Sequence, residues 1–116
     1  MDKVLIQDLR VQGVLGINAW ERNTPCEIVI NVTLFTAPRP APRPDTLAGC
    51  VDYSQMAKDI RTLVEAARRF TVEALAEDIA HLCLKRPNVR KVMVKVEKPG
   101  AVKEVRSVGV EIERQR

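Results

Sequence analysis

A chain of 116 residues, of which 46% are hydrophobic and 29% charged, has the length and balance of one globular domain, spanning residues 1–116. Its apolar runs are shorter than the roughly 20 residues needed to cross a bilayer, so no membrane span is expected. A net charge of +4 suggests nucleic acid as a partner, but aromatic residues make up only 3% and the basic residues are scattered. An RNA-binding sheet module is therefore the less favoured alternative.

The cysteine and histidine content limits the chemistry. Cys26, Cys50 and Cys83 are odd in number and widely spaced, as expected for reduced thiols rather than for a disulfide framework. His81 is the only histidine, which nearly excludes zinc sites built from three histidines or from paired cysteines and histidines. We expect no metal and no cofactor, and a cytoplasmic protein whose N-terminus lacks a secretory signal.

The first third of the chain has the alternation of β-strands. Residues 3–11 predict a first strand with Val4 and Ile6 on one face. Residues 26–35 predict a longer second strand. One face of this strand is apolar and consists of Ile28, Ile30, Val32 and Leu34.

A proline-rich segment follows at residues 38–44. Its prolines fix φ, lack backbone donors and favour extended geometry, so a stiff surface connector is predicted. A proline ligand for another domain is the alternative, but so short a tract between two structured segments is more often a loop.

Two amphipathic helices are predicted next. Ser54 is a suitable N-cap for the first helix and Thr71 for the second, and the segment Arg86-Pro87-Asn88 ends the second. The apolar stripe of the first consists of Met56, Ile60, Leu63, Val64 and Ala67. The stripe of the second consists of Val72, Leu75, Ile79, Leu82 and Cys83.

Residues 92–96 and 108–112 alternate again and predict two closing strands. The resulting order, ββααββ, indicates an α+β fold with a four-stranded, largely antiparallel sheet and both helices covering its apolar face, while the other face meets water. Such a sheet has two open edges that a ring of identical subunits would remove, so a homo-oligomer is expected.

Four stretches of the chain resemble the dihydroneopterin aldolase family. They are residues 13–17 leading to 20–22, residues 50–53, residues 72–77, and residues 97–101 with the ending 108–114. The match spans nearly the whole chain, and the stretches have the order and spacing typical of the family.

This resemblance implies a tunnelling fold (T-fold) whose subunits close into a barrel, commonly as tetramers stacked into an octamer, with active sites between neighbours. The implied reaction is a retro-aldol cleavage of 7,8-dihydroneopterin into 6-hydroxymethyl-7,8-dihydropterin and glycolaldehyde, a step of folate biosynthesis. Similar enzymes need neither a Schiff base nor a metal, because electrons of the cleaved bond flow into the ring imine of the substrate.

The resemblance assigns substrate binding to the start of the second helix. Glu73 matches the carboxylate that holds the pterin ring, since two carboxylate oxygens can accept hydrogen bonds in parallel from a ring N–H and an amino group. Val72 would offer its backbone to the same ring. The alternative for Glu73 is a favourable but purely structural interaction with the helix dipole.

Three residues match the family's proton-transfer groups. Lys98 and Glu21 correspond to the lysine and the carboxylate that position a water, and Tyr53 to a tyrosine that enters the site from the adjacent subunit. Val51 and Asp52 would border the ring. Without the resemblance, Lys98 and Glu21 would be ordinary surface residues and Tyr53 a half-buried aromatic residue.

Some features depart from the family or favour a related activity. Cys26 stands where relatives usually have glutamine, and a small inert thiol is the favoured interpretation because no histidine lies near it in sequence. The region around Val14 and Leu15 lacks a histidine that some relatives have. A dihydroneopterin or dihydroneopterin phosphate epimerase and a non-catalytic pterin- or purine-binding relative remain alternatives. Basic residues that could meet a phosphate are Arg39, Arg43, Lys103 and Arg106.

Overall fold

The chain folds in the predicted order of two strands, two helices and two strands. The computed structural model describes residues 1–38 and 45–116, so positions 39–44 of the predicted connector, with Arg39 and Arg43, lie outside the described residues. The elements are β1 (Asp2–Gly13), the 3-10 helix η1 (Ala19–Asn23), β2 (Cys26–Thr36), α1 (Tyr53–Ala67), α2 (Val72–Leu84), β3 (Lys91–Pro99) and β4 (Ser107–Gln115).

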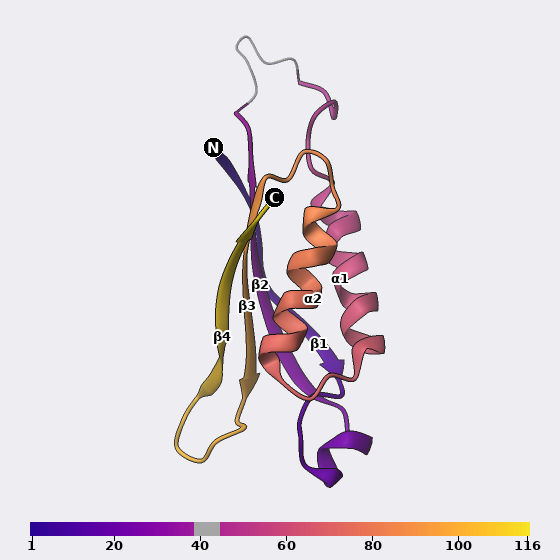
Figure 1. Cartoon of the computed structure of the whole chain (residues 1–116), viewed down its shortest axis with the longest axis vertical. Coiled ribbons are helices and arrows are strands. Elements are labelled where there is room, and N and C mark those ends of the chain that lie inside the picture. The colour runs from indigo at the N-terminus through magenta and orange to yellow at the C-terminus, as the bar shows by residue number, and fades with distance from the viewer. Residues whose placement is uncertain (39–44) are drawn as a thin grey trace.

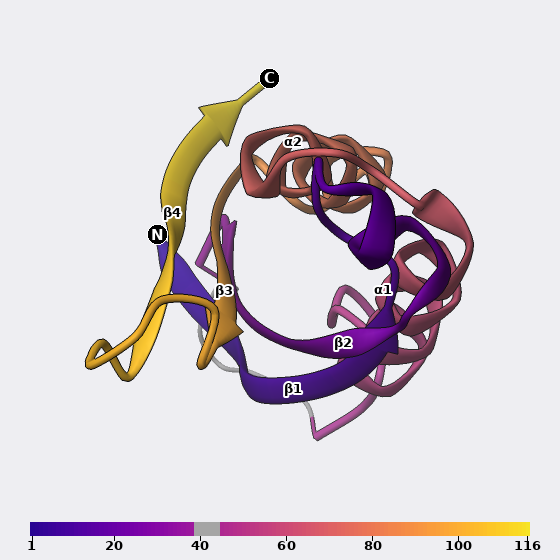
Figure 2. The ribbon, with the colours of Figure 1, turned by 90° about the horizontal axis from the view of Figure 1, so that it is seen from below.

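The four strands form one antiparallel sheet in the spatial order β1-β2-β3-β4. Both helices lie on the same side of this sheet (Figure 1). The sheet curves around them, so that α1 and α2 sit on its concave side (Figure 2). The predicted α+β class and element order are confirmed. Within the described residues, no helix is long and apolar enough to cross a membrane.

The core lies between the helices and the two central strands. A strand turns every second side chain to one face, and a helix turns every third or fourth, so the predicted apolar positions meet in one layer. Seven strand residues are at most 1% exposed: Ile28, Ile30, Val32, Leu34, Val92, Val94 and Val96. The helices bury Met56, Ile60, Val64, Leu75, Ile79 and Cys83 against them.

The helix starts agree with the sequence in one case and not in the other. Thr71 caps α2 as predicted, since its side chain accepts a hydrogen bond from the backbone N–H of Ala74. The prediction of Ser54 as the cap of α1 is wrong: Asp52 is the N-cap, and its carboxylate accepts from the N–H of Gln55 at 3.0 Å. Both residue types can cap a helix, and Asp52, two positions before Ser54, was not predicted as the cap.

A β-bulge interrupts β1, which the sequence did not predict. The register with β2 shifts between Ile6 and Leu9, and Asp8 adopts a left-handed backbone with φ of 55°. The Asp8 N–H, which the bulge removes from the regular ladder, donates instead to the side-chain oxygen of Asn31 at 2.8 Å. The bulge adds one residue to β1 between Ile6 and Leu9. Leu9 therefore packs against the core on the same face of the sheet as Ile6.

The helix-free face of the sheet is polar but not fully exposed. Lys91 pairs with Glu113 at 3.2 Å across β3 and β4. Phe35 on this face is nevertheless only 7% exposed, and the ammonium groups of Lys3 and Lys91 lie 5.4 and 4.6 Å from its ring centroid. The expectation of a wholly wet face is therefore only partly right.

Candidate active site

Lys98 and Glu21, which are 77 positions apart in sequence, meet at the end of β3. The Lys98 Nζ lies 2.8 Å from Glu21 Oε2 and donates to the backbone oxygen of Leu15 at 2.7 Å. Their side chains are only 15% and 13% exposed. The ion pair is therefore largely shielded from water, which strengthens it relative to an ordinary surface pair.

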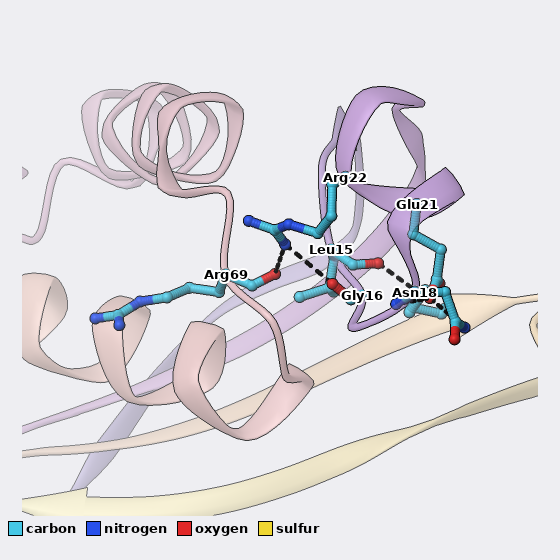
Figure 3. A network of polar contacts seen from close by, with 7 residues as sticks. Leu15, Gly16, Asn18, Glu21, Arg22 and Arg69 are labelled. Atoms are coloured by element: carbon cyan, nitrogen blue, oxygen red, sulfur yellow. Dashed lines mark hydrogen bonds and ion pairs between the residues drawn. The ribbon is translucent and has the colours of Figure 1, made fainter.

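Glu21 is held on its other oxygen by Asn18, which precedes η1. The backbone N–H and the side-chain amide of Asn18 donate to Glu21 Oε1 at 3.1 and 2.7 Å (Figure 3). The hydrogen bond from Lys98 and then the backbone N–H of Asn18 hold the pKa of Glu21 below its ordinary value. Glu21 is therefore an ionised acceptor of fixed orientation at neutral pH.

A pocket of about 290 Å³ opens beside this pair. Its walls come from the loop after β1, the start of β2 and the turn between β3 and β4. Trp20, Cys26 and Gly100 line it together with Lys98 and Glu21. The pocket joins a few polar groups to apolar walls, which is the usual composition of a small-molecule site.

Glu73 and Val72 lie at the same end of the molecule as this pocket, but not in its wall. They begin α2 directly after Thr71. Arg69, two positions before Thr71, accepts a hydrogen bond from the N–H of Gly16, next to Leu15. Glu73 is exposed and, within the described part of the chain, has no hydrogen-bond or ion-pair partner. Its carboxylate is therefore available to an external ligand.

Tyr53, Val51 and Asp52 lie at the opposite end of the sheet. Tyr53 and Val51 line a separate pocket of about 480 Å³ beside Lys3, at the start of β1. Leu15, which Lys98 contacts, follows the other end of β1, and α1 extends from Tyr53 toward that end over 15 residues, about 22 Å at roughly 1.5 Å per residue. Within one chain, then, the predicted site residues form two groups that do not meet. Tyr53 is 64% exposed, so its side chain is free to face another subunit.

The chain matches the family model of dihydroneopterin aldolase over residues 4–113, which is nearly its whole length. It belongs to the dihydroneopterin aldolase family. The dihydroneopterin aldolase of Escherichia coli K12 is 38% identical over 114 residues, which cover 98% of this chain and 93% of that enzyme. The folic acid synthesis protein FOL1 of Dictyostelium discoideum is also 38% identical over 114 residues, but this chain spans only 17% of its length.

Solved structures of the dihydroneopterin aldolase family superpose closely on the chain. The FolB structure of Vibrio cholerae has a TM-score of 0.94 at 34% identity and covers all of this chain and 98% of that one. The Escherichia coli aldolase in complex with neopterin has a TM-score of 0.91 at 38% identity, covering 98% and 99% of the two chains. The family resemblance in the sequence is thus confirmed.

The positions of Asn18 and Cys26 beside the pocket were not predicted from the sequence. Asn18 stands three positions before Glu21, a spacing that places it at the start of η1 and within reach of that carboxylate, but η1 itself was not predicted. Cys26 was interpreted as a small inert thiol, and it proves to line the pocket beside Lys98. Burial raises the pKa of Cys26, so the thiol is protonated at neutral pH and the interpretation as an unreactive group agrees with its surroundings.

The described residues contain no cluster of three or more His, Cys, Asp or Glu side chains that could bind a metal. Beside the pocket, the Glu21 carboxylate can accept hydrogen bonds and the Lys98 ammonium group can donate them.

Proposed function

We propose that this chain is a dihydroneopterin aldolase, a carbon–carbon lyase that cuts the side chain of 7,8-dihydroneopterin in folate biosynthesis, and that Lys98, Glu21, Glu73 and Tyr53 carry the reaction. The Lys98–Glu21 pair at 2.8 Å beside the pocket is the observation on which the proposal depends. It sets a donor and an acceptor next to each other in a partly dry site, as proton transfer requires.

In the proposed reaction, the protein moves protons while the substrate accepts the electrons. The proton of the 2′-hydroxyl leaves, the C1′–C2′ bond breaks to release glycolaldehyde, and its electron pair enters the N5=C6 imine of the ring. A proton then returns to C1′, which gives 6-hydroxymethyl-7,8-dihydropterin. No oxidant, reductant or additional reactant is consumed.

Lys98 has one donor left for this task. An ammonium group has three N–H donors, and two of them are used on Leu15 and Glu21. The third can hold a water or a substrate oxygen in the pocket. Glu21 holds the Lys98 ammonium group in place, because the orientation of the Glu21 carboxylate is itself set by hydrogen bonds from Asn18.

Glu73 and Val72 would bind the pterin rim, and the second half of the site would come from a neighbouring subunit. Tyr53 begins α1, whose 15 residues extend about 22 Å toward the Lys98 end at roughly 1.5 Å per residue, so its side chain is too far away to act on a substrate bound there within the same chain. A ring in which the Tyr53 end of one subunit meets the Lys98 end of the next would complete the site. In such a ring Val51 and Asp52 would border the substrate from the same side as Tyr53.

The direct test is product formation without metal. Purified protein in EDTA is expected to release glycolaldehyde from 7,8-dihydroneopterin. Inversion at C2′ without glycolaldehyde would replace the aldolase by the epimerase. Tight neopterin binding without either product would leave a non-catalytic pterin-binding protein.

Substitutions separate binding from turnover. Glu73→Ala is expected to weaken neopterin binding by about 100-fold, since two charge-assisted hydrogen bonds contribute roughly 3 kcal/mol together. Lys98→Ala is expected to lower kcat while neopterin still binds. Glu77→Ala is the matched control, because Glu77 is one turn further along α2 and pairs with Arg114 instead. Unchanged neopterin affinity in Glu73→Ala would refute the anchoring role.

A cytoplasmic location is part of the same proposal. Cys26, Cys50 and Cys83 lie in three separate parts of the fold, and an odd number of widely spaced cysteines suits a reducing compartment. Cell fractionation with an antibody against the protein tests this location.

A further inference from the structure

The residue after Glu21 joins two segments that are far apart in sequence. Arg22 donates from Nη1 to the carbonyl oxygens of Gly16 at 3.0 Å and Arg69 at 3.1 Å, and from Nη2 to that of Arg68 at 2.6 Å. Figure 3 shows its guanidinium group reaching from the η1 segment to Gly16 and to the α1–α2 connection. The contact is reciprocal, since Arg68 Nη2 donates to the Arg22 carbonyl oxygen at 2.6 Å.

Two of the three carbonyl groups that Arg22 binds, those of Arg68 and Arg69, lie at the end of α1. Arg68 is the left-handed C-cap of that helix, with φ of 49°, and the last carbonyl groups of a helix have no further N–H donors within the helix. A cation at a helix C-terminus is stabilised by the dipole as well as by the hydrogen bonds. The guanidinium carbon also lies 4.1 Å from the ring centroid of Phe70.

Each of the joined segments carries one part of the proposed site. The 3-10 helix η1 carries Glu21 next to Arg22, and Glu21 orients Lys98. The α1–α2 connection leads through Thr71 to Glu73 at the start of α2. No direct contact between Glu21 and Glu73 exists in the described structure, so their relative position depends on what lies between them.

We infer that Arg22 is a positioning residue, which fixes the proton-transfer pair relative to the pterin-binding carboxylate. This inference rests on the proposed function, because it assigns a consequence for turnover to the link between the two segments. Three carbonyl groups on two segments require a planar fork of donors, which only arginine supplies. Lysine at this position would keep the charge but not the three simultaneous hydrogen bonds.

The inference predicts a specific pattern of kinetics. Binding of the pterin ring needs only the Glu73 carboxylate, whereas bond cleavage needs the bound pterin and Lys98 in the correct relative position. Arg22→Met, which keeps length and loses all donors, is expected to lower kcat per neopterin-binding site on the order of tenfold or more, with a change in neopterin affinity below about threefold. Arg22→Lys is expected to show the same separation of kcat from affinity.

The control is another arginine that joins two elements. Arg86→Gln removes a guanidinium that links the end of α2 to Asp59 in α1 at 2.7 Å and contacts neither site segment. It is expected to lower Tm as Arg22→Met does, while kcat per binding site remains within about twofold of the unmodified protein. A purely structural role of Arg22 would lower the number of binding sites and leave kcat per site unchanged, which would overturn the inference.

Amide hydrogen exchange tests the link without relying on activity. In Arg22→Met, the N–H groups of Gly16 and Ala74 are expected to exchange faster together, because they lie on the two segments that Arg22 holds. In Arg86→Gln they are expected to remain protected. If the unmodified protein did not release glycolaldehyde, the proposed function would be wrong. Faster exchange of both amides in Arg22→Met would still support the link between the two segments. Unchanged exchange of both amides would refute the link itself.

Discussion

Gly16 determines where the carboxylate of Glu21 can lie. Its backbone has φ of 153°, and a Cβ atom built on it would overlap the carboxyl carbon and both oxygens of Glu21. The hydrogen at this position is therefore what lets the carboxylate approach the loop closely enough to reach Asn18 and Lys98. The geometry of the ion pair thus depends on a residue with no side chain.

Gly16→Ala is expected to displace Glu21 and to lower kcat on the order of 100-fold, since misplacing a catalytic group by about 1 Å can cost that much. The measurement is glycolaldehyde release per neopterin-binding site. Neopterin affinity should change little, because Glu73 is on another segment. A Gly16→Ala protein with unmodified kcat would contradict the crowding at Glu21.

The pKa of Glu21 is expected to depend on Lys98. Lys98→Met is expected to raise the pKa of Glu21, because the Lys98 hydrogen bond is the largest influence holding it below 4.5. A carboxylate whose pKa is lower in the folded than in the unfolded protein stabilises the fold at pH values above the unfolded pKa. This stabilisation is lost as the pH falls through the folded pKa. The stability difference between the unmodified protein and Lys98→Met should therefore be largest above about pH 4.5 and shrink in more acidic solution.

NMR titration of the Glu21 carboxyl carbon measures this shift directly. Lys95→Met is the control, since Lys95 pairs with Glu97 at 3.6 Å and has no contact with Glu21. Identical titration of Glu21 in all three proteins would show that Lys98 does not control it.

The contacts among the site residues could be predicted from the sequence only in part. Lys98 and Glu21 could be brought together only through the family resemblance, because nothing in their local patterns points across 77 positions. The contacts of Arg22 and Asn18 were not predicted, since both act through a turn whose geometry is set by tertiary contacts rather than by periodicity.

Helix α1 begins at Tyr53 because Asp52 supplies the first side-chain acceptor. The carboxylate binds the N–H of Gln55, and its negative charge also suits the positive end of the helix. The position matters for function, since the cap fixes the start of the helix on which Tyr53 is exposed.

Asp52→Ala is expected to lower the free energy of unfolding by about 0.5–2 kcal/mol, as loss of an N-cap does. Ser54→Ala, at the position that the sequence favoured, should change it by less than about 0.5 kcal/mol. Urea unfolding of both variants measures the difference. Equal losses in the two variants would contradict the observed cap.

Elements with a repeating pattern were predicted well and those that break the pattern were not. The buried faces of β2, β3, α1 and α2 follow directly from periods of two and 3.6 residues. The bulge at Asp8 and the helix η1 interrupt such periods. Asp8 needs the side chain of Asn31, 23 positions away, to satisfy its N–H, so no local signal could reveal the bulge.

At the scale of the whole molecule, the two groups of site residues lie at opposite ends of the sheet. The Lys98 pocket follows the end of β1 and the Tyr53 pocket borders its start. Both edge strands, β1 and β4, are available for pairing with other copies. A closed ring would use these edges and bring the two groups together at each boundary.

Mixing two inactive variants tests this arrangement. Tyr53→Phe and Lys98→Met are each expected to be nearly inactive, but random assembly after joint unfolding and refolding should restore roughly a quarter of the sites, because each site takes one group from each neighbour. The measurement is glycolaldehyde release before and after joint refolding. A mixture that stays as inactive as its components would show that each chain carries its whole site.

The distance between the Lys98 end and the Tyr53 end of every chain also has a genetic consequence. A subunit that folds and assembles normally but is damaged at both ends would spoil two sites, its own pocket and the one it completes next door. In a cell making intact and damaged subunits in equal amounts, most sites would contain at least one damaged half. Such an allele would act dominantly over the intact copy, whereas an allele whose product cannot assemble would be recessive.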